Sequence, residues 1–220
     1  MNVTWLLISV FNAIFVSLVF YLVITYLEGA IGFDLKKKGK LINDKVVVII
    51  GIITLITTGV ITYFRFPNMI LEMKILTNIF ICVMASLSVC DIKKTVVPNR
   101  VIFTSLFIWM LVISVSIIFN TSQGVALLGK SLIGGVISGV IFLFCYLVTK
   151  KKLGAGDVKL AFILGLYMTS ERMFGGIFYG SILCCLFSIV QIMRKKLSFK
   201  SGVPMVPFLY MGCLITYLIL

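Results

Sequence analysis

Long apolar runs separated by short polar connections make up almost the whole chain. A helix that spans a membrane needs roughly 20 apolar residues, because each residue advances the helix by about 1.5 Å. Eight runs have this character, and they cover residues 5–27, 46–64, 73–90, 101–119, 126–149, 158–169, 174–193 and 205–220. The pattern predicts an all-α polytopic membrane protein with about eight transmembrane helices, of which the sixth is short. Residues 1–220 are expected to form one integral-membrane domain.

The first run, from Trp5 to Leu27, contains no charged residue. It has no basic flank before it and no small-residue cleavage site after it, as a removed signal peptide would have. We therefore expect a retained helix.

Composition supports the membrane assignment and limits the chemistry. The chain is 61% hydrophobic and 12% charged, with a mean hydropathy of +1.19, whereas soluble domains are about half apolar and a quarter charged. It has no His, which excludes Ser–His and Cys–His catalysis and His-rich metal sites. The six cysteines lie in or beside apolar runs without any Cys-x-x-Cys pair, so they are interpreted as small hydrophobic residues. No metal or cofactor is predicted.

The net charge of +13 follows from membrane topology and does not indicate nucleic-acid binding. Sixteen of the 20 Lys and Arg residues fall in one set of alternate connections, 28–45, 91–100, 150–159 and 194–200. Basic residues concentrate on the cytoplasmic side of membrane proteins. This set is therefore predicted to be cytoplasmic, in the inner (cytoplasmic) membrane, with both termini outside. The Lys36–Lys40 run is interpreted as a topology signal, with binding of anionic lipid headgroups as an alternative.

Two of the seven carboxylates stand apart from the rest. Five are interpreted as solvated surface charges: Glu28, Asp34, Asp44, Glu72 and Glu171. Asp91 directly follows an apolar run and Asp157 directly precedes another, so both are expected at one membrane depth on the cytoplasmic side. An ionisable group there costs several kcal/mol unless it is paired or hydrated, which makes both functional candidates. A plain juxtamembrane charge at Asp91 and a helix cap at Asp157 remain the structural alternatives.

As a pair, the two carboxylates predict acid–base chemistry. Two carboxylates within a few ångströms cannot both ionise, so one keeps a proton. The charged one can activate water, while the protonated one hydrogen-bonds the scissile carbonyl. Such a dyad hydrolyses a peptide bond without His, metal or Ser.

Three sequence patches surround these aspartates. Asp91 is followed after six residues by Pro98-Asn99, and Asn99 is expected to cap a helix that starts near Arg100. Asp157 closes the segment Gly154-Ala-Gly156-Asp157 and is followed by Val-Lys159-Leu. The third patch is Pro204-Met-Val-Pro207-Phe-Leu. Lys159 is interpreted either as a neighbour of the dyad or as a residue that reaches for the membrane interface.

In these patches the chain resembles the bacterial type IV prepilin leader peptidases of the Gly-x-Gly-Asp aspartyl protease family. They are similar to that family's Asp-x6-Pro-Asn/Asp, Gly-x-Gly-Asp-x-Lys-Leu and Pro-x-Gly-Pro-Phe-Leu segments, and they cover the chain from about residue 75 onward. The resemblance implies catalytic roles for Asp91 and Asp157. It also implies removal of the short basic leader of prepilins or pseudopilins, after a glycine and before the apolar helix of the substrate.

The resemblance also has departures. Longer members carry a cytoplasmic domain with two Cys-x-x-Cys pairs and methylate the new N-terminus with S-adenosylmethionine. Here the corresponding stretch is the short basic loop 28–45, without cysteine, so methyltransferase activity is not expected. Val206 stands where the family commonly has Gly.

Three other functions remain open at this stage. A signal-peptide-peptidase-like protease would share Gly-x-Gly-Asp, although that group carries a Tyr-Asp motif in its first catalytic helix. A small ion-coupled transporter could use the same aspartates, although transporter carboxylates usually lie near the bilayer midplane. A non-catalytic scaffold gives no reason for the pair. Separately, Gly135-x-x-x-Gly139 and Gly176-x-x-x-Gly180 are predicted to let helices pack closely.

Overall fold

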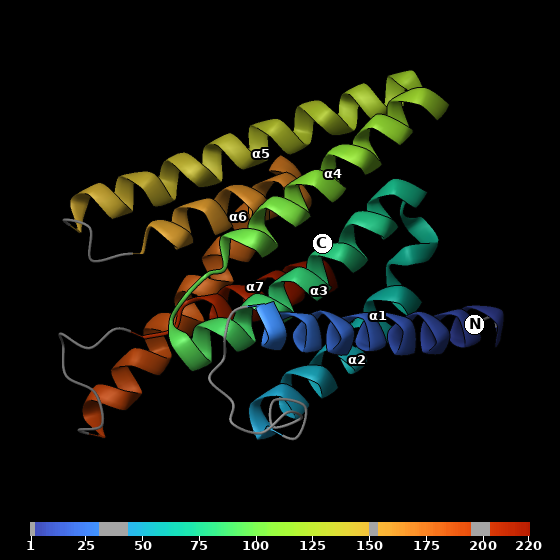
Figure 1. Ribbon diagram of the computed structural model, residues 1–220. Helices are drawn as coiled ribbons and strands as arrows, with labels where there is room; N and C mark the ends of the chain where they lie inside the picture. Colours follow the sequence, from blue (N-terminus) through green and yellow to red (C-terminus); the bar gives the residue numbers. More distant parts are fainter. Residues whose placement is uncertain (1–2, 31–43, 150–153, 195–202) are drawn as a thin grey trace.

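A computed structural model describes residues 3–30, 44–149, 154–194 and 203–220. These residues form seven α-helices and one short 3-10 helix, with no strand among them (Figure 1): α1 (Val3–Ala30), α2 (Lys45–Phe64), η1 (Phe66–Asn68), α3 (Leu71–Lys94), α4 (Asn99–Phe119), α5 (Thr121–Val148), α6 (Ala155–Met193) and α7 (Val206–Ile219). The predicted all-α class is confirmed. The Lys36–Lys40 run, the Lys150–Lys152 cluster and most of the loop 28–45 lie outside the described residues.

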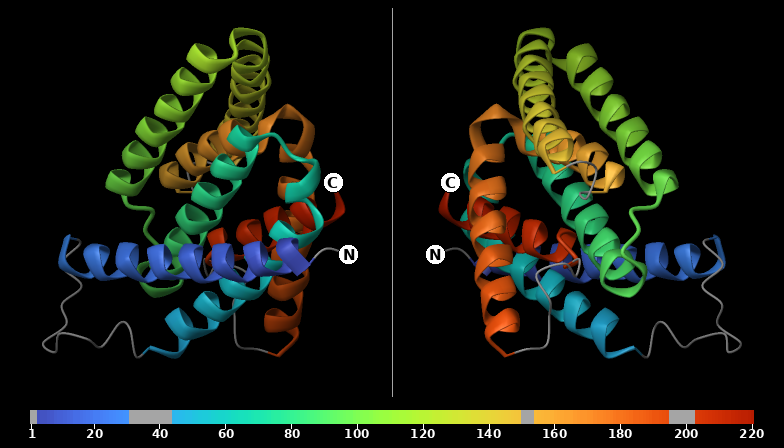
Figure 2. Two further views of the ribbon diagram at one scale, coloured as in Figure 1. Left: turned by 90° about the vertical axis from the view of Figure 1, so that its right-hand side faces the viewer. Right: turned by 90° about the vertical axis from the view of Figure 1, so that its left-hand side faces the viewer.

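Six helices, α1 to α6, are long and apolar enough to cross a membrane, and α7 is shorter. The count of eight separate spans is not confirmed, because the expected sixth and seventh spans both belong to α6. At Thr169 the backbone of α6 leaves helical geometry, with φ 62° and ψ 171°. Figure 2 shows that the part of α6 after this break lies at a large angle to the part before it. The run 158–169 is therefore the first arm of a bent helix.

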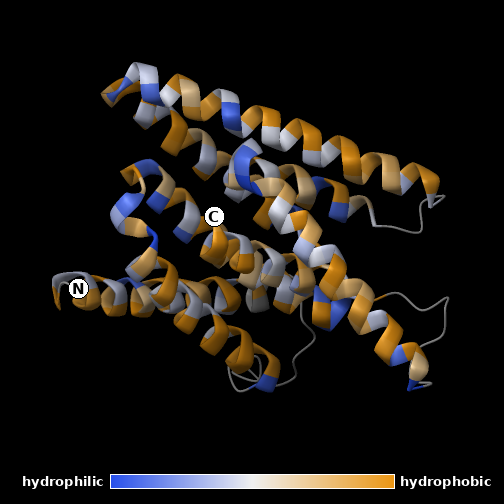
Figure 3. Ribbon diagram, turned by 180° about the vertical axis from the view of Figure 1, so that it is seen from behind, coloured by the Kyte–Doolittle hydropathy of each residue, from blue (hydrophilic) through white to orange (hydrophobic). Residues whose placement is uncertain are grey.

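Helix α3 is the centre of the bundle. In its most apolar stretch 72% of the residues are buried, against 17% to 39% in the other five long helices. It contacts α1, α2, α4, α6 and α7 (Figures 1 and 2). Large apolar side chains of the surrounding helices face outward, among them Phe107 and Phe144. Figure 3 shows apolar positions along most of the outer helices. A lipid-facing exterior explains this distribution, since water would disfavour so many exposed apolar groups.

Small residues allow the two arms of α6 to approach their neighbours. The carbonyl oxygen of Gly134 on α5 lies where a side chain at Gly165 would begin, and Ser138 donates a hydrogen bond to the carbonyl of Ala161 over 2.8 Å. In the second arm, Gly176 and Gly180 lie against Gly212 of α7. Close backbone contact between small residues is a common way to pack helices in membranes. The role predicted for Gly176-x-x-x-Gly180 is confirmed.

Polar residues gather at two opposite ends of α3. At its start, Glu72 accepts a hydrogen bond from Ser116 of α4 over 3.3 Å. At its end, Lys93 forms an ion pair with Asp44, the N-cap of α2. Asp44 was expected to be a simple solvated charge. It instead caps α2 by accepting a hydrogen bond from the Val46 amide over 3.0 Å, because the first amides of a helix need acceptors.

Candidate active site

Asp91 lies in the last turn of α3 and is buried, with 6% of its surface exposed. Its Oδ2 accepts a hydrogen bond from the backbone N–H of Val206 over 2.9 Å. The backbone N–H of Met205 also faces this carboxylate and favours its charged form. Asp91 is therefore bound to the first residues of α7, which are more than a hundred positions away in the sequence.

The third sequence patch supplies these donors. Met205 is the N-cap of α7, Val206 is its first residue, and Pro207 follows in the first turn. The first amides of a helix have no partner within the helix, and the N-terminal end of the helix favours a negative charge. The two prolines, Pro204 and Pro207, flank the two amides that face Asp91, and they carry no N–H of their own.

Asp157 lies in the first turn of α6 and is half-buried. It is not the N-cap residue, since that position is held by Gly154. The N–H of Asp157 donates to the carbonyl of Gly154 over 3.0 Å, and its carboxylate faces the backbone N–H of Gly154. This reciprocal arrangement resembles a capping box, in which the third helical residue bonds back to the cap. The alternative of Asp157 as the cap itself is corrected, although its side chain does bind the helix start.

The fold brings the two aspartates together. Helices α3 and α6 are in contact, and Asp157 lies within range of the charge on Asp91. The two carboxyl groups come from positions 66 residues apart in the sequence. Their shared end of the bundle is the one that also holds Lys93 and Asp44.

The first two patches pack directly on each other. A side chain at Gly156 would begin 3.0 Å from Cβ of Val97, so the start of α6 lies against the connection between α3 and α4. Lys159 Nζ donates a hydrogen bond to Asn99 Oδ1 over 3.0 Å. The three patches thus meet at one end of the bundle, around Asp91 and Asp157.

The expected cap at Asn99 is not present. Helix α4 begins at Asn99, its N-cap is Pro98, and no side chain caps it. The backbone of Pro98 is extended, with φ −67° and ψ 123°, and its carbonyl accepts the first bond of the helix, from Val101. The side-chain oxygen of Asn99 instead accepts the hydrogen bond from Lys159.

Four further residues of this region had no role in the sequence prediction. They are Val97, which contacts Gly156; Met205 and Val206, whose amides face Asp91; and Cys184 of α6, which lies within range of the charge on Asp91. The Pro-x-x-Pro spacing is the one signal that pointed toward the two amides. No local pattern marks Val97 or Cys184.

Metal-binding clusters of three or more His, Cys, Asp or Glu residues do not occur in the described part of the chain. All six cysteines are free thiols.

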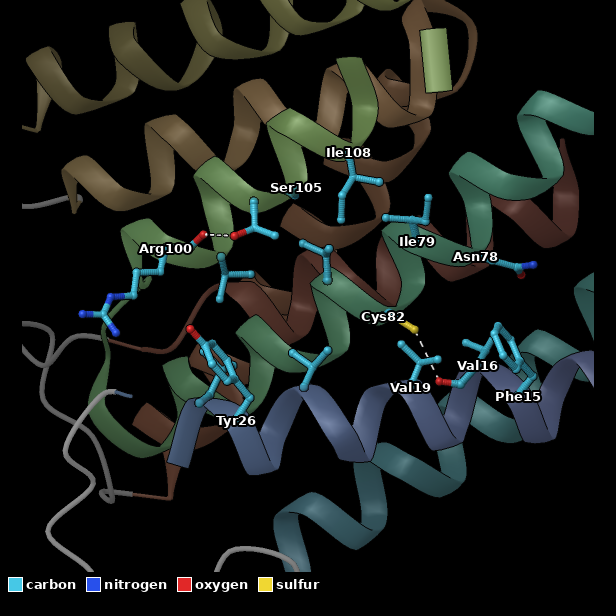
Figure 4. Close-up of a pocket in the computed structure, with 15 residues that line it drawn as sticks. Phe15, Val16, Val19, Tyr26, Asn78, Ile79, Cys82, Arg100, Ser105 and Ile108 are labelled. Carbon is cyan, nitrogen blue, oxygen red and sulfur yellow. Dashed lines mark hydrogen bonds between the residues drawn. The ribbon is translucent and has the colours of Figure 1, made fainter. Parts of the chain in front are cut away.

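A separate apolar cavity of about 290 Å³ lies between α1, α3 and α4 (Figure 4). Val19, Cys82 and Ile108 are among the residues that line it, and Arg100 lies at one end. Neither Asp91 nor Asp157 lines this cavity. The candidate site is therefore formed by the end of α3, the starts of α6 and α7, and the connection before α4.

The fold and the site together define a helical membrane protein in which two acidic side chains from different helices lie at the same end of the bundle, within range of each other's charge. The model of the type IV leader peptidase family matches residues 78–189, just over half of the 220-residue chain. The chain belongs to this family. The matched segment contains Asp91, Asp157 and the first two patches, while Pro204–Pro207 follow it. Comparisons with curated proteins and with solved structures give no match.

Proposed function

We propose that this protein is a membrane aspartyl endopeptidase that removes the short basic leader of type IV prepilins or pseudopilins. The observation that carries the proposal is the approach of Asp91 and Asp157, from α3 and α6, in a chain of the type IV leader peptidase family. In a chain without His, a carboxylate pair is the simplest means of activating water.

The proposed chemistry needs only the two carboxyl groups and water. One carboxylate takes a proton from water as the water oxygen attacks the scissile carbonyl. The other carboxyl group donates a hydrogen bond to the carbonyl oxygen, where negative charge develops. Gly154 and Ala155 beside Asp157 are exposed, which leaves the start of α6 open to water at the proposed cytoplasmic face.

The proposed substrate approaches from the membrane. Its apolar helix lies in the bilayer, and the leader cleavage site at the end of that helix reaches the depth of Asp91 and Asp157. Sixteen of the 20 Lys and Arg residues mark this end of the helices as cytoplasmic. The proposed site therefore lies at the cytoplasmic face of the cytoplasmic membrane, with both termini on the other side.

Leader removal without N-methylation is the activity proposed for the whole chain as one integral-membrane domain. The loop 28–45 contains no cysteine that could replace the Cys-x-x-Cys pairs of longer relatives. Membership in the type IV leader peptidase family favours prepilin processing over signal-peptide-peptidase chemistry. The placement of both aspartates in terminal helical turns argues against ion-coupled transport, since transporters bind ions near the midplane.

The test is leader removal by single variants. Asp91→Ala and Asp157→Ala are each expressed with a small protein that has a basic leader, a glycine and an apolar helix, and cleavage is followed by mass spectrometry. Each is expected to abolish cleavage while the protein remains in the membrane. Glu72→Ala, at the opposite end of α3, is the matched control and should cleave normally. If either aspartate variant processes the substrate at the normal rate, the proposed pair is wrong.

A further inference from the structure

The two aspartates have different hydrogen-bond environments. Asp91 accepts a hydrogen bond from the backbone N–H of Val206 and is also faced by the backbone N–H of Met205, both at the start of α7. Asp157 is faced by one backbone N–H, that of Gly154, the cap of its own helix. Asp91 is also the more deeply buried of the two, and burial by itself disfavours a charged carboxylate, so the donors at the start of α7 have to offset this cost.

We propose that the N-terminus of α7 holds Asp91 as the ionised member of the pair, so that Asp91 is the general base and Asp157 carries the proton. This assignment rests on the proposed function. Backbone donors stabilise a carboxylate and not its protonated form, and a helix N-terminus adds a favourable partial positive charge. Met205 and Val206 are positioning residues, since their amides act through Asp91.

The other ionisable groups around Asp91 in the described residues do not reverse this order. On α3 itself this group is Cys90, and on α6 they are Asp157 and Cys184. On α7 the groups that face Asp91 are the two backbone amides.

The assignment fixes where each proton moves. Asp91 takes a proton from water, the water oxygen bonds to the scissile carbon, and Asp157 gives its proton to the carbonyl oxygen. The resulting tetrahedral diol collapses as Asp91 passes its proton to the leaving nitrogen and the carbon–nitrogen bond breaks. One hydroxyl proton returns to Asp157. The pair is restored, and one water has been consumed for one new carboxyl group and one new amine.

The direct test removes one amide from Asp91. Val206 is the first residue of α7 and its N–H is not used within the helix, so Val206→Pro deletes the donor without deleting a helical hydrogen bond. The matched control, Val206→Ala, keeps the N–H and loses the buried side chain. The measurement is kcat/KM for leader cleavage by the full chain in detergent or vesicles between about pH 4 and pH 9.

Loss of the amide makes Asp91 easier to protonate. In Val206→Pro the acid limb of the profile is expected to move to higher pH by roughly one pH unit, since a hydrogen bond to a charged group is worth about tenfold or more. In Val206→Ala the limb should stay at its wild-type position, even where the rate falls. If the acid limbs of the kcat/KM profiles of the two variants coincide, the proposed role of the Val206 amide is wrong.

A second pair of variants keeps the proposal testable if Val206→Pro does not fold. Asp157→Asn still offers an N–H to a bound oxygen, whereas Asp91→Asn removes the only acceptor for the proton of water. A peptide inhibitor with a central hydroxyl in place of the scissile bond should therefore bind Asp157→Asn within about threefold of wild type and bind Asp91→Asn at least about tenfold more weakly. Equal loss in both variants, or the reverse order, contradicts the assignment.

Different results would contradict the proposed function and the division of roles between the two aspartates. A wild-type protein that cleaves no leader substrate at any pH contradicts the proposed function. A protein that cleaves the leader, but shows equal limbs for the Val206 variants or equal inhibitor binding for the Asn variants, contradicts only the division of roles.

Discussion

The ammonium group of Lys159 donates a hydrogen bond to the side-chain oxygen of Asn99 over 3.0 Å, which joins two patches that are 60 residues apart in the chain. Lys159 lies two residues after Asp157, and Asn99 lies at the start of α4, directly after the connection that follows Asp91. This bond ties the start of α6 to the start of α4 beside both aspartates.

Loss of this bond is expected to weaken leader cleavage modestly. In Lys159→Ala, kcat/KM should fall about threefold, because Lys159 is exposed and a hydrogen bond at an exposed position contributes about 0.5–1 kcal/mol. Asn99→Asp offers the lysine a charged acceptor and should keep or raise the rate. Lys45→Ala, which removes an exposed lysine from the start of α2, is the control. A drop of equal size in the control would show that net charge, and not the bond, matters.

Gly156 is expected to tolerate no large side chain. A Cβ there would lie 3.0 Å from Cβ of Val97, so Gly156→Val must push the connection before α4 away from Asp157. Leader cleavage should be lost in Gly156→Val and reduced about fivefold in Gly156→Ala. Stability should hold in the alanine variant, since Ala favours a helix by about 1 kcal/mol over Gly. Val97→Gly removes the opposing Cβ and should restore part of the activity of Gly156→Ala. Failure of this rescue would place the defect elsewhere.

The crossing of α5 and α6 is expected to depend on Gly165. A Cβ there would overlap the carbonyl oxygen of Gly134 and the hydroxyl of Ser138, and a backbone oxygen cannot move aside cheaply. Gly165→Ala should lower the free energy of unfolding by about 2 kcal/mol or more, measured by thermal or denaturant unfolding in micelles. Gly129→Ala on α5 is the matched control, because no atom lies within 4 Å of the Cβ it would add, and it should be neutral or slightly stabilising. Equal stability of both variants would contradict this contact.

Asp44 is expected to make the stability of the protein depend on pH in the acid range. The hydrogen bond from Lys93, with that from the Val46 amide, holds the pKa of Asp44 below its usual value. A lowered folded-state pKa means that the stabilisation is present above about pH 4 and is lost as the pH falls through the folded-state pKa.

The variants of Asp44 separate the cap from the ion pair. Asp44→Ala loses both and should cost about 1 kcal/mol at pH 7, mainly through the cap. Asp44→Asn keeps a capping oxygen and should cost a few tenths of a kcal/mol, because an exposed ion pair contributes little. Unfolding in micelles at pH 7 and near pH 3 checks this. The difference in the free energy of unfolding between wild type and Asp44→Asn should shrink near pH 3. A larger difference there than at pH 7 would contradict the lowered pKa of Asp44.

The hydropathy pattern predicted the helices well where a polar connection interrupts them. The predicted run ends at residues 64, 119 and 193 coincide with the last residues of α2, α4 and α6. The pattern did not predict that 158–169 and 174–193 belong to one bent helix. Glu171 and Arg172 interrupt the apolar pattern there as a loop would, whereas the backbone departs from helical geometry at Thr169.

Side-chain capping was the weaker part of the sequence prediction. Asn99 has the residue type of a cap and Asp44 lies at the end of a basic loop, yet Asp44 caps α2 and Asn99 binds Lys159. Residue type gives the capacity to cap a helix, but the path of the backbone into the helix decides which residue does so.

The sequence by itself determined the class of protein, because a bilayer demands long apolar runs and leaves few places for a charge. For the same reason it singled out Asp91 and Asp157. Only the tertiary structure decided that the amides of Met205 and Val206 face Asp91 and that Val97 lies against Gly156. These contacts depend on the direction of main-chain N–H groups and on how helices cross, and neither is written in the local pattern of residues.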